Sequence, residues 1–222
     1  MLDKVTGDLD VALAGLGDRA AIMVGGFGLA GTPDGLLGGL ARRGLRGLTL
    51  ISNNAGHGEE GIAAIVNSGA VSKVICSFPR FSIPFERLYR RGEIELELVP
   101  QGTLSERIRA GGAGIGGFFT RTGAGTELTK DREQRLIDGQ EHVLEMPLRA
   151  DFALILARVA DRTGNLLYSK SARNYNPTMA MAADVTVAEV GELVEVGALD
   201  PEAIVTPGIF VDRVYHSSSR EP

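Results

Sequence analysis

Residues 24–33 read Val-Gly-Gly-Phe-Gly-Leu-Ala-Gly-Thr-Pro, which is the composition of a ligand-binding turn. The apolar residues 20–24 predict a strand that enters this turn, and residues 33–43 predict a helix that leaves it. Backbone N–H groups left unpaired between a strand and a helix suit an anionic or oxyanionic ligand. Glycine is expected where φ is positive or where a ligand approaches the backbone closely. Pro33 fits the first helical position, where an N–H would have no partner.

Residues 26–31 also match the glycine fingerprint of dinucleotide-binding proteins, but the second half of that fingerprint is missing. The fingerprint requires an acidic residue at the end of the next strand, where it binds the ribose. The next predicted strand covers residues 48–51 and ends in Ser-Asn-Asn-Ala-Gly, with neither an acidic residue nor an arginine. A nicotinamide cofactor is therefore disfavoured.

The composition indicates a globular protein without a basic surface for nucleic acid. The chain has 222 residues, 44% of them hydrophobic, and a net charge of −5, which fits a single α/β domain over residues 1–222. Cys76 is the one cysteine, so an intrachain disulfide is excluded. No apolar run approaches the roughly 18 residues of a membrane span, and residues 1–8 lack the apolar core of a secretion signal. We expect a cytoplasmic protein that binds no membrane.

Strands and helices alternate over the first hundred residues, which is typical of a mostly parallel sheet. Strands are predicted at residues 20–24, 48–51, 71–77 and 93–99, and helices at residues 8–16, 33–43, 62–66 and 85–90. Glutamates alternate with apolar residues in 93–99, so this strand is expected at a sheet margin with a solvated face.

Polar and glycine-rich loops follow four of these strands, at residues 25–31, 52–58, 77–80 and 100–103. Ligands bind outside the carboxyl ends of strands in open α/β sheets. The four loops are therefore expected to converge on one edge of the sheet and to form a site there.

The second half of the chain has a different pattern, which predicts an added antiparallel portion. Thr103 and Glu106 have the spacing of a capping box for a helix over residues 104–110. Residues 111–126 are expected to be an ordered loop pressed against a ligand or partner, the alternative being a glycine-rich surface loop. Asp138 and Gly139 predict a hairpin turn. Strands are expected at residues 152–159, 166–168, 185–190 and 209–214, and a helix at 179–183.

Several long sequence blocks resemble the A (alpha) subunits of the family I coenzyme A transferases. The blocks are Gly-Gly-Phe at 25–27 with Gly-Thr-Pro at 31–33, and residues 51–54, 99–112, 171–177 and 206–211. The resemblance covers residues 20–215 and implies the CoA-transferase fold, a mostly parallel sheet with helices on both faces. It also implies transfer of CoA from an acyl-CoA to a free acid through a glutamyl thioester on the enzyme.

The resemblance implies that the nucleophilic glutamate lies in a Ser-Glu-Asn-Gly motif of a B (beta) chain, a motif that is absent here. The present chain would then be half of an enzyme, in an A2B2 heterotetramer by family inference. CoA thioesters would be its substrates, with no permanently bound cofactor and no metal. Glu59 and Glu60 are more simply capping or surface residues.

The same resemblance assigns roles to individual residues. Gln101 is similar to the family glutamine whose amide faces the reacting carbonyl as an oxyanion donor, the alternative being a loop glutamine bonded to its own backbone. Asn53 and Asn54 would bind substrate oxygens or hold the glycine loop, although either could merely close a turn. The glycine loop would supply backbone donors and an apolar contact beside the acyl group, from Gly25, Gly26, Phe27, Gly28 and Gly31.

Two acceptor acids fit the resemblance, 3-oxoadipate and acetoacetate, each with succinyl-CoA as donor. Residues 52–56, 76–80 and 144–148 favour 3-oxoadipate, and Arg80 is our choice of partner for its second carboxylate. Residues 81–87 are shorter than that branch predicts, and residues 85–87 are similar to the acetoacetate branch.

The sequence also offers three further candidate residues and two alternative functions. Cys76 is expected to be an inert buried thiol, His57 an ordinary loop histidine, and Arg173 an anchor, a contact with another chain or a substrate residue. Folds related to this family bind phosphosugars, so a stand-alone sugar-phosphate isomerase or a binding module is the remote alternative. Either would work without a partner, and the isomerase would need its own base in the cleft.

Overall fold

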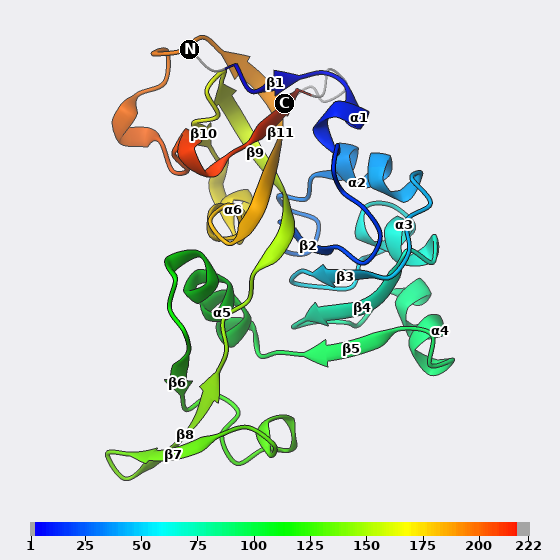
Figure 1. Cartoon of the computed structure of the whole chain (residues 1–222), viewed down its shortest axis with the longest axis vertical. Coiled ribbons are helices and arrows are strands. Elements are labelled where there is room, and N and C mark those ends of the chain that lie inside the picture. Colours follow the sequence, from blue (N-terminus) through cyan, green and yellow to red (C-terminus); the bar gives the residue numbers. More distant parts are fainter. Residues whose placement is uncertain (1–2, 217–222) are drawn as a thin grey trace.

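The computed structural model describes residues 3–216, which form a nine-stranded sheet and a separate three-stranded sheet (Figure 1). The large sheet has the order β1-β12-β11-β9-β2-β3-β4-β5, and β10 pairs with β9. All neighbours in that order are parallel, and the β9–β10 pair is antiparallel. The strands are β1 Val5–Thr6, β2 Ala21–Val24, β3 Leu48–Ile51, β4 Val71–Cys76, β5 Glu95–Leu98, β9 Ala150–Asp161, β10 Leu166–Leu167, β11 Ala183–Val194 and β12 Arg213–His216.

Helices cover both faces of this sheet, as expected (Figure 1). They are α1 Leu9–Ala12, α2 Asp34–Ala41, α3 Ile62–Asn67, α4 Ile83–Arg90, α5 Gln101–Ala113 and α6 Asn176–Ala180. Successive residues of β2 point to opposite faces, so that Ile22 and Val24 join the core under α1 to α4, whereas Met23 joins the core under α5 and α6. Burial of these two apolar faces holds the layers together.

The early strands and helices match their predicted positions closely, with small shifts at the ends. Asp8 caps α1 by accepting from the N–H groups of Asp10 and Val11, but α1 ends at Ala12 rather than at residue 16. Pro33 is the N-cap of α2, not its first helical residue. α4 begins two residues before its predicted start, with a proline in its first turn.

Two elements predicted in the last third of the chain are present but misplaced along the sequence. The helix predicted at residues 179–183 is α6, which covers Asn176–Ala180 instead. It begins earlier because Pro177 fits its first turn, and it ends before β11 starts at Ala183. The strand predicted at residues 209–214 is a 3-10 turn, Gly208–Phe210, followed by β12. β9 and β11 are both longer than predicted, since they pair with each other over most of their length.

The capping box predicted at Thr103 is also wrong, because α5 begins three residues earlier than predicted, at Gln101. Pro100 occupies the N-cap in extended conformation and its carbonyl accepts from Leu104 N–H. Thr103 is therefore buried within the first turn, and Glu106 pairs with Arg109 instead. Gln101, expected on a loop, is the first residue of this helix.

Residues 111–126 are only partly the expected loop, since α5 continues to Ala113 and residues 118–120 form a strand. The helix glycines permit close packing: a Cβ on Gly111 would lie 1.9 Å from the Leu148 carbonyl oxygen, and one on Gly112 would lie 2.8 Å from Met181 Cβ. Gly114 ends the helix in the left-handed conformation, at φ +70°.

The three-stranded antiparallel sheet extends away from the large sheet beside α5 (Figure 1). It has the order β6-β8-β7, with β6 Phe118–Thr120, β7 Gln134–Ile137 and β8 Gln140–Glu145. The predicted hairpin turn is confirmed, with Asp138 and Gly139 both at positive φ, +50° and +72°.

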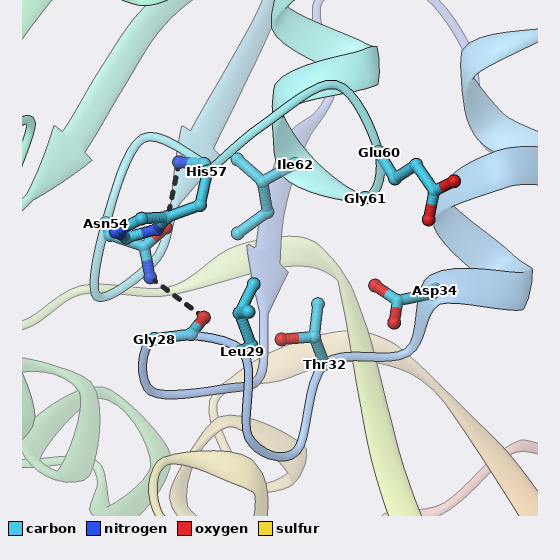
Figure 2. Close-up of a pocket in the computed structure, with 10 residues that line it drawn as sticks. Gly28, Leu29, Thr32, Asp34, Asn54, His57, Glu60, Gly61 and Ile62 are labelled. Carbon is cyan, nitrogen blue, oxygen red and sulfur yellow. Dashed lines mark hydrogen bonds between the residues drawn. The ribbon is translucent and has the colours of Figure 1, made fainter. Parts of the chain in front are cut away.

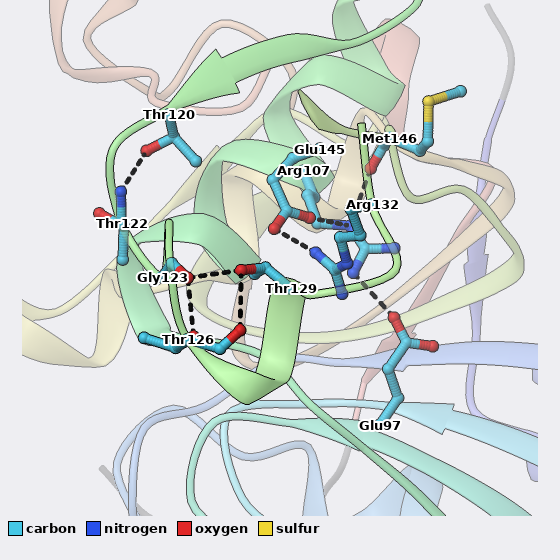
Figure 3. A network of polar contacts seen from close by, with 10 residues as sticks. All are labelled: Glu97, Arg107, Thr120, Thr122, Gly123, Thr126, Thr129, Arg132, Glu145 and Met146. Atoms are coloured by element: carbon cyan, nitrogen blue, oxygen red, sulfur yellow. Dashed lines mark hydrogen bonds and ion pairs between the residues drawn. The ribbon is translucent and has the colours of Figure 1, made fainter. Parts of the chain in front are cut away.

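A network of charged side chains joins this small sheet to the edge of the large one (Figure 3). Glu145 of β8 is 1% exposed and forms ion pairs with Arg132 and Arg107. Arg107 of α5 also donates to Glu97 of β5 at 2.8 Å, and Lys73 lies 2.9 Å from the other oxygen of that carboxylate. Burial raises the pKa of Glu97, but hydrogen bonds from Arg107 and Lys73 outweigh this effect and hold the pKa below its usual value. The expectation of a solvated glutamate face on β5 is therefore wrong for Glu97, because its carboxylate is paired with Arg107 and Lys73 and its side chain is only 26% exposed.

Glu97→Gln should lower the free energy of unfolding at neutral pH by about 1 to 3 kcal/mol, because it removes a charged acceptor shared by two cations. A carboxyl with a depressed pKa in the folded state stabilises above its unfolded pKa, near 4.5, and this stabilisation is lost as pH falls through the folded pKa. The deficit of the variant should therefore shrink in acid. Urea unfolding from neutral pH downward measures it, with the exposed Glu95→Gln as control. A pH-independent deficit would contradict the assignment.

Candidate functional site

The four polar loops meet at one edge of the sheet, as expected. They follow β2, β3, β4 and β5, which are neighbours and parallel. Successive loops are bonded to one another: Asn54 Nδ2 donates to the Gly28 carbonyl at 3.4 Å, and Phe78 N–H donates to the Asn53 carbonyl at 3.0 Å. Val99 N–H donates to the carbonyl of Cys76 at 3.0 Å. The carboxyl edge is thus a continuous surface built from segments far apart in sequence.

Most N–H donors of the glycine loop are already used inside the protein. Gly25 N–H donates to Leu154, and Phe27 exchanges hydrogen bonds with Ala30 in both directions. Gly26 N–H donates to Asn174 Oδ1 at 3.1 Å. The expectation that Gly25, Gly26 and Phe27 offer donors to a ligand is therefore wrong, because strand pairing and loop closure consume them.

Within the described residues the Gly31 N–H is also unpaired but buried, so Gly28 and Leu29 remain as donors to a ligand. Within residues 3–216 neither of their N–H groups has a hydrogen-bond partner. The Phe27 side chain is 46% exposed beside them, so the apolar contact expected of it is available.

Internal packing explains most of the glycines in this loop. A Cβ on Gly25 would lie 1.8 Å from Asn176 Oδ1, and a Cβ on Gly31 would lie 2.3 Å from the Ala172 carbonyl oxygen. Gly28 differs, because no atom lies within 4 Å of its Cβ position; like Gly31 it has a positive φ, at +62°. Among these three, only Gly28 faces open space.

The asparagines after β3 mainly hold the loops. Asn53 and Asn54 are 5% and 2% exposed. Asn54 Oδ1 accepts from Gly56 N–H at 2.8 Å while its Nδ2 reaches Gly28. This geometry favours the expectation that Asn54 closes a turn and holds the glycine loop over direct substrate binding.

Gln101 and Arg80 present their side chains to solvent at the same edge. Gln101 is exposed at the start of α5, and its carbonyl accepts from the Tyr175 hydroxyl at 3.3 Å. Arg80 is exposed in the loop after β4 and forms no ion pair within the described residues. An amide and an unpaired guanidinium are thus both available to a ligand.

Residues 174–176 were not assigned roles from the sequence, yet they lie at the centre of the site. Tyr175 is 6% exposed, and burial raises the pKa of its phenol although the side chains of Asn53 and Ser77 act in the opposite direction. Asn176 is fully buried; its Nδ2 donates to Gly31 and its Oδ1 accepts from Leu156. The only signal in the sequence was the resemblance of residues 171–177 to the family. Arg173, in the same block, forms no ion pair among residues 3–216.

A cavity of about 230 Å³ lies between the loops after β2 and β3 (Figure 2). Gly28, Asn54 and His57 line one end, and the carboxylates of Asp34 and Glu60 line the other (Figure 2). His57 Nδ1 is buried without a hydrogen-bond partner in the described part of the chain.

Among the described residues, this edge holds no reactive thiolate and no cluster of metal-ligating side chains. Burial raises the pKa of the Cys76 thiol to about 12, so it stays protonated. In residues 3–216 no three His, Cys, Asp or Glu side chains are grouped as metal ligands. Every helix in the same range is too short or too polar to span a bilayer.

Comparison with known proteins gives concordant matches. The family model described as Coenzyme A transferase matches residues 6–217. The A chain of the 3-oxoadipate CoA-transferase of Pseudomonas putida is 57% identical over 96% of this chain and 94% of its own. The A chain of the succinyl-CoA:3-ketoacid coenzyme A transferase of Xanthomonas campestris is 48% identical over 96% of this chain and 89% of its own.

A solved structure shows the same fold at low sequence identity. An acyl-CoA transferase from E. coli O157:H7 superposes with a TM-score of 0.86 at 22% identity, over 99% of this chain and 48% of that chain. The chain therefore spans about half the length of that protein.

Gly25→Ala should destabilise the protein by about 3 kcal/mol or more, because the new methyl group must displace the buried Asn176 side chain. Gly28→Ala is the matched control, with free space around its Cβ, and should cost only about 1 to 2 kcal/mol for its positive φ. Urea unfolding of both variants compares the two costs, and equal losses would refute the packing explanation.

Proposed function

The chain belongs to the coenzyme A transferase family, and we propose that it is the A (alpha) chain of an enzyme that transfers CoA from succinyl-CoA to 3-oxoadipate. The observation that carries this proposal is the 57% identity to the A chain of a 3-oxoadipate CoA-transferase over nearly the whole of both chains. The converging loops at the carboxyl edge support it, because they offer hydrogen-bond donors to an acyl group.

The proposed reaction uses a glutamate of the partner, the B (beta) chain. Its carboxylate attacks the thioester carbonyl of succinyl-CoA, CoA leaves as the thiolate, and a mixed anhydride forms. The thiolate then attacks the glutamyl carbonyl, releasing succinate and leaving CoA as a glutamyl thioester. The carboxylate of 3-oxoadipate then attacks the glutamyl thioester, which releases the CoA thiolate and forms a second mixed anhydride. The thiolate attacks the 3-oxoadipyl carbonyl of this anhydride, giving 3-oxoadipyl-CoA and the free glutamate. Each attack converts a carbonyl into an oxyanion that needs hydrogen-bond donors.

The chain described here contributes the wall that faces those oxyanions. Gln101 supplies a side-chain amide, and Gly28 and Leu29 supply unpaired backbone N–H groups within the described residues. Phe27 supplies an apolar contact beside the acyl group. Glu59 and Glu60 do not lie in a Ser-Glu-Asn-Gly motif and have no role in the transfer.

The acceptor is distinguished by its second carboxylate. We place this group at Arg80, whose exposed guanidinium has no ion-pair partner in the described residues and can bind a carboxylate through two N–H groups. Acetoacetate is the second candidate, supported by the 48% identity to the A chain of a succinyl-CoA:3-ketoacid transferase. We also propose an A2B2 assembly, a cytoplasmic location and no permanently bound cofactor.

The proposal is tested by measuring CoA transfer from succinyl-CoA to 3-oxoadipate and to acetoacetate, with this chain alone and with its co-expressed partner. Activity is expected only in the complex, with 3-oxoadipate preferred. Gln101→Ala in the complex should lower kcat by about 10²-fold. Activity of the isolated chain would overturn the division of roles and would revive a stand-alone enzyme.

Arg80→Ala should raise KM for 3-oxoadipate by roughly 10- to 100-fold, since a charged hydrogen bond contributes about 1.5–3 kcal/mol. KM for acetoacetate, which lacks the second carboxylate, should change little. Arg91→Ala is the control, because Arg91 is exposed at the end of α4 and forms no ion pair within residues 3–216. An equal rise for both acids would exclude Arg80 as the carboxylate partner.

A further inference from the structure

The Asn174 side chain holds the glycine loop on both sides of its free donors. Its Oδ1 accepts from Gly26 N–H at 3.1 Å, and its Nδ2 donates to the Ala30 carbonyl at 2.9 Å. Gly28 and Leu29 lie between these two attachment points. Because the reciprocal Phe27–Ala30 hydrogen bonds close the intervening turn, Asn174 fixes where the two unpaired N–H groups lie.

The backbone of Asn174 is in an unusual conformation, with φ +22° and ψ −119°. Asparagine tolerates positive φ better than most residues. An amide also provides an acceptor and a donor in one rigid group. Oδ1 additionally accepts from Tyr175 N–H at 2.7 Å, and Nδ2 donates to the Ala172 carbonyl at 3.1 Å. The amide is therefore fixed by its own segment before it contacts the glycine loop.

Asn176 has a different task, although it lies two residues away. It is fully buried and bonds to Gly31 and Leu156, so it joins the loop exit to the neighbouring strand β9. Asn174 contacts the loop on both sides of the unpaired donors, and Asn54 adds a longer contact to the Gly28 carbonyl at 3.4 Å. Asn176 also donates to Asn174 Oδ1 at 3.3 Å and so helps to hold the Asn174 amide, but the direct contacts to Gly26 and Ala30 come from Asn174.

We propose that Asn174 is a positioning residue for CoA transfer, which places the Gly28 and Leu29 N–H groups against the developing oxyanion. This inference rests on the proposed function of the glycine loop. A displacement of about 1 Å in such a group can cost roughly 100-fold in rate. In this proposal Asn174 acts through the glycine loop rather than on the substrate, so its loss should lower kcat and leave substrate binding nearly unchanged.

Asn174→Gly is the direct test, because glycine keeps the positive φ and removes only the amide. In the complex with the partner chain, kcat should fall roughly 10- to 100-fold while KM for succinyl-CoA stays within about twofold. Backbone amides of residues 25–31 should exchange with deuterium faster than in the wild type. Unchanged kcat would overturn the proposal.

Asn165→Gly is the matched control. The Asn165 amide also joins two segments, accepting from Gly208 N–H at 2.8 Å and donating to Asp161 at 2.7 Å. Asn165 follows the end of β9, at Asp161. That end lies seven residues, or roughly 23 Å, beyond Leu154, whose carbonyl bonds to the start of the glycine loop. Asn165 is therefore far from the proposed donors. The kcat of the Asn165→Gly complex and the amide hydrogen exchange at its residues 25–31 should match those of the wild type. If Asn165→Gly lowers kcat as much as Asn174→Gly does, the effect comes from general destabilisation and the proposal fails.

Two further outcomes are also decisive. If the Asn174→Gly complex does not assemble, Asn174→Asp keeps the acceptor for Gly26 but cannot donate to Ala30, and wild-type kcat from that folded complex would overturn the proposal. If the wild-type complex transfers no CoA, the proposed function fails. Hydrogen exchange at residues 25–31 then decides alone whether Asn174 holds the loop.

Discussion

The packing of residues 174–176 against the carboxyl edge of the parallel sheet is the interaction on which the site depends. Asn174 and Asn176 bond to the glycine loop after β2, and the Tyr175 hydroxyl bonds to Gln101 at the start of α5. These three side chains join segments more than 70 positions apart in the sequence. Loops that would otherwise be independent are thereby held in one arrangement, which preorganises them for an oxyanion.

This packing changes the meaning of the glycine signature. Gly25 and Gly31 are required because asparagine side chains and a carbonyl occupy the space of a Cβ. Among the described residues, the N–H groups of Gly28, Leu29 and the buried Gly31 have no partner, so those of Gly28 and Leu29 are the ones free to face a ligand. The motif is thus mainly a packing motif that exposes two donors, and this division explains how a loop with so many glycines can be rigid enough to orient a reacting group.

The sequence predicted the first half of the fold well and found the hairpin turn and most strands of the second half, but it misplaced helices α5 and α6 and the last strand. Short apolar strands such as β3 lie between glycines and polar residues, so their local pattern suffices to find them. Thr103 was mistaken for a cap because the local pattern fits a capping box, whereas Pro100 begins the helix. The contacts of Asn174 could not be found from the sequence, because its partners lie about 145 positions away and no periodicity marks a side chain that bonds to a distant backbone.

The central claim is that this chain supplies the oxyanion donors and its partner supplies the nucleophile. Mass spectrometry of the separated, denatured chains after incubation of the complex with succinyl-CoA tests this most directly. We expect a covalent CoA adduct on the partner chain and none on the chain described here. A CoA adduct on this chain, at Glu59, Glu60 or any other residue, would contradict the claim.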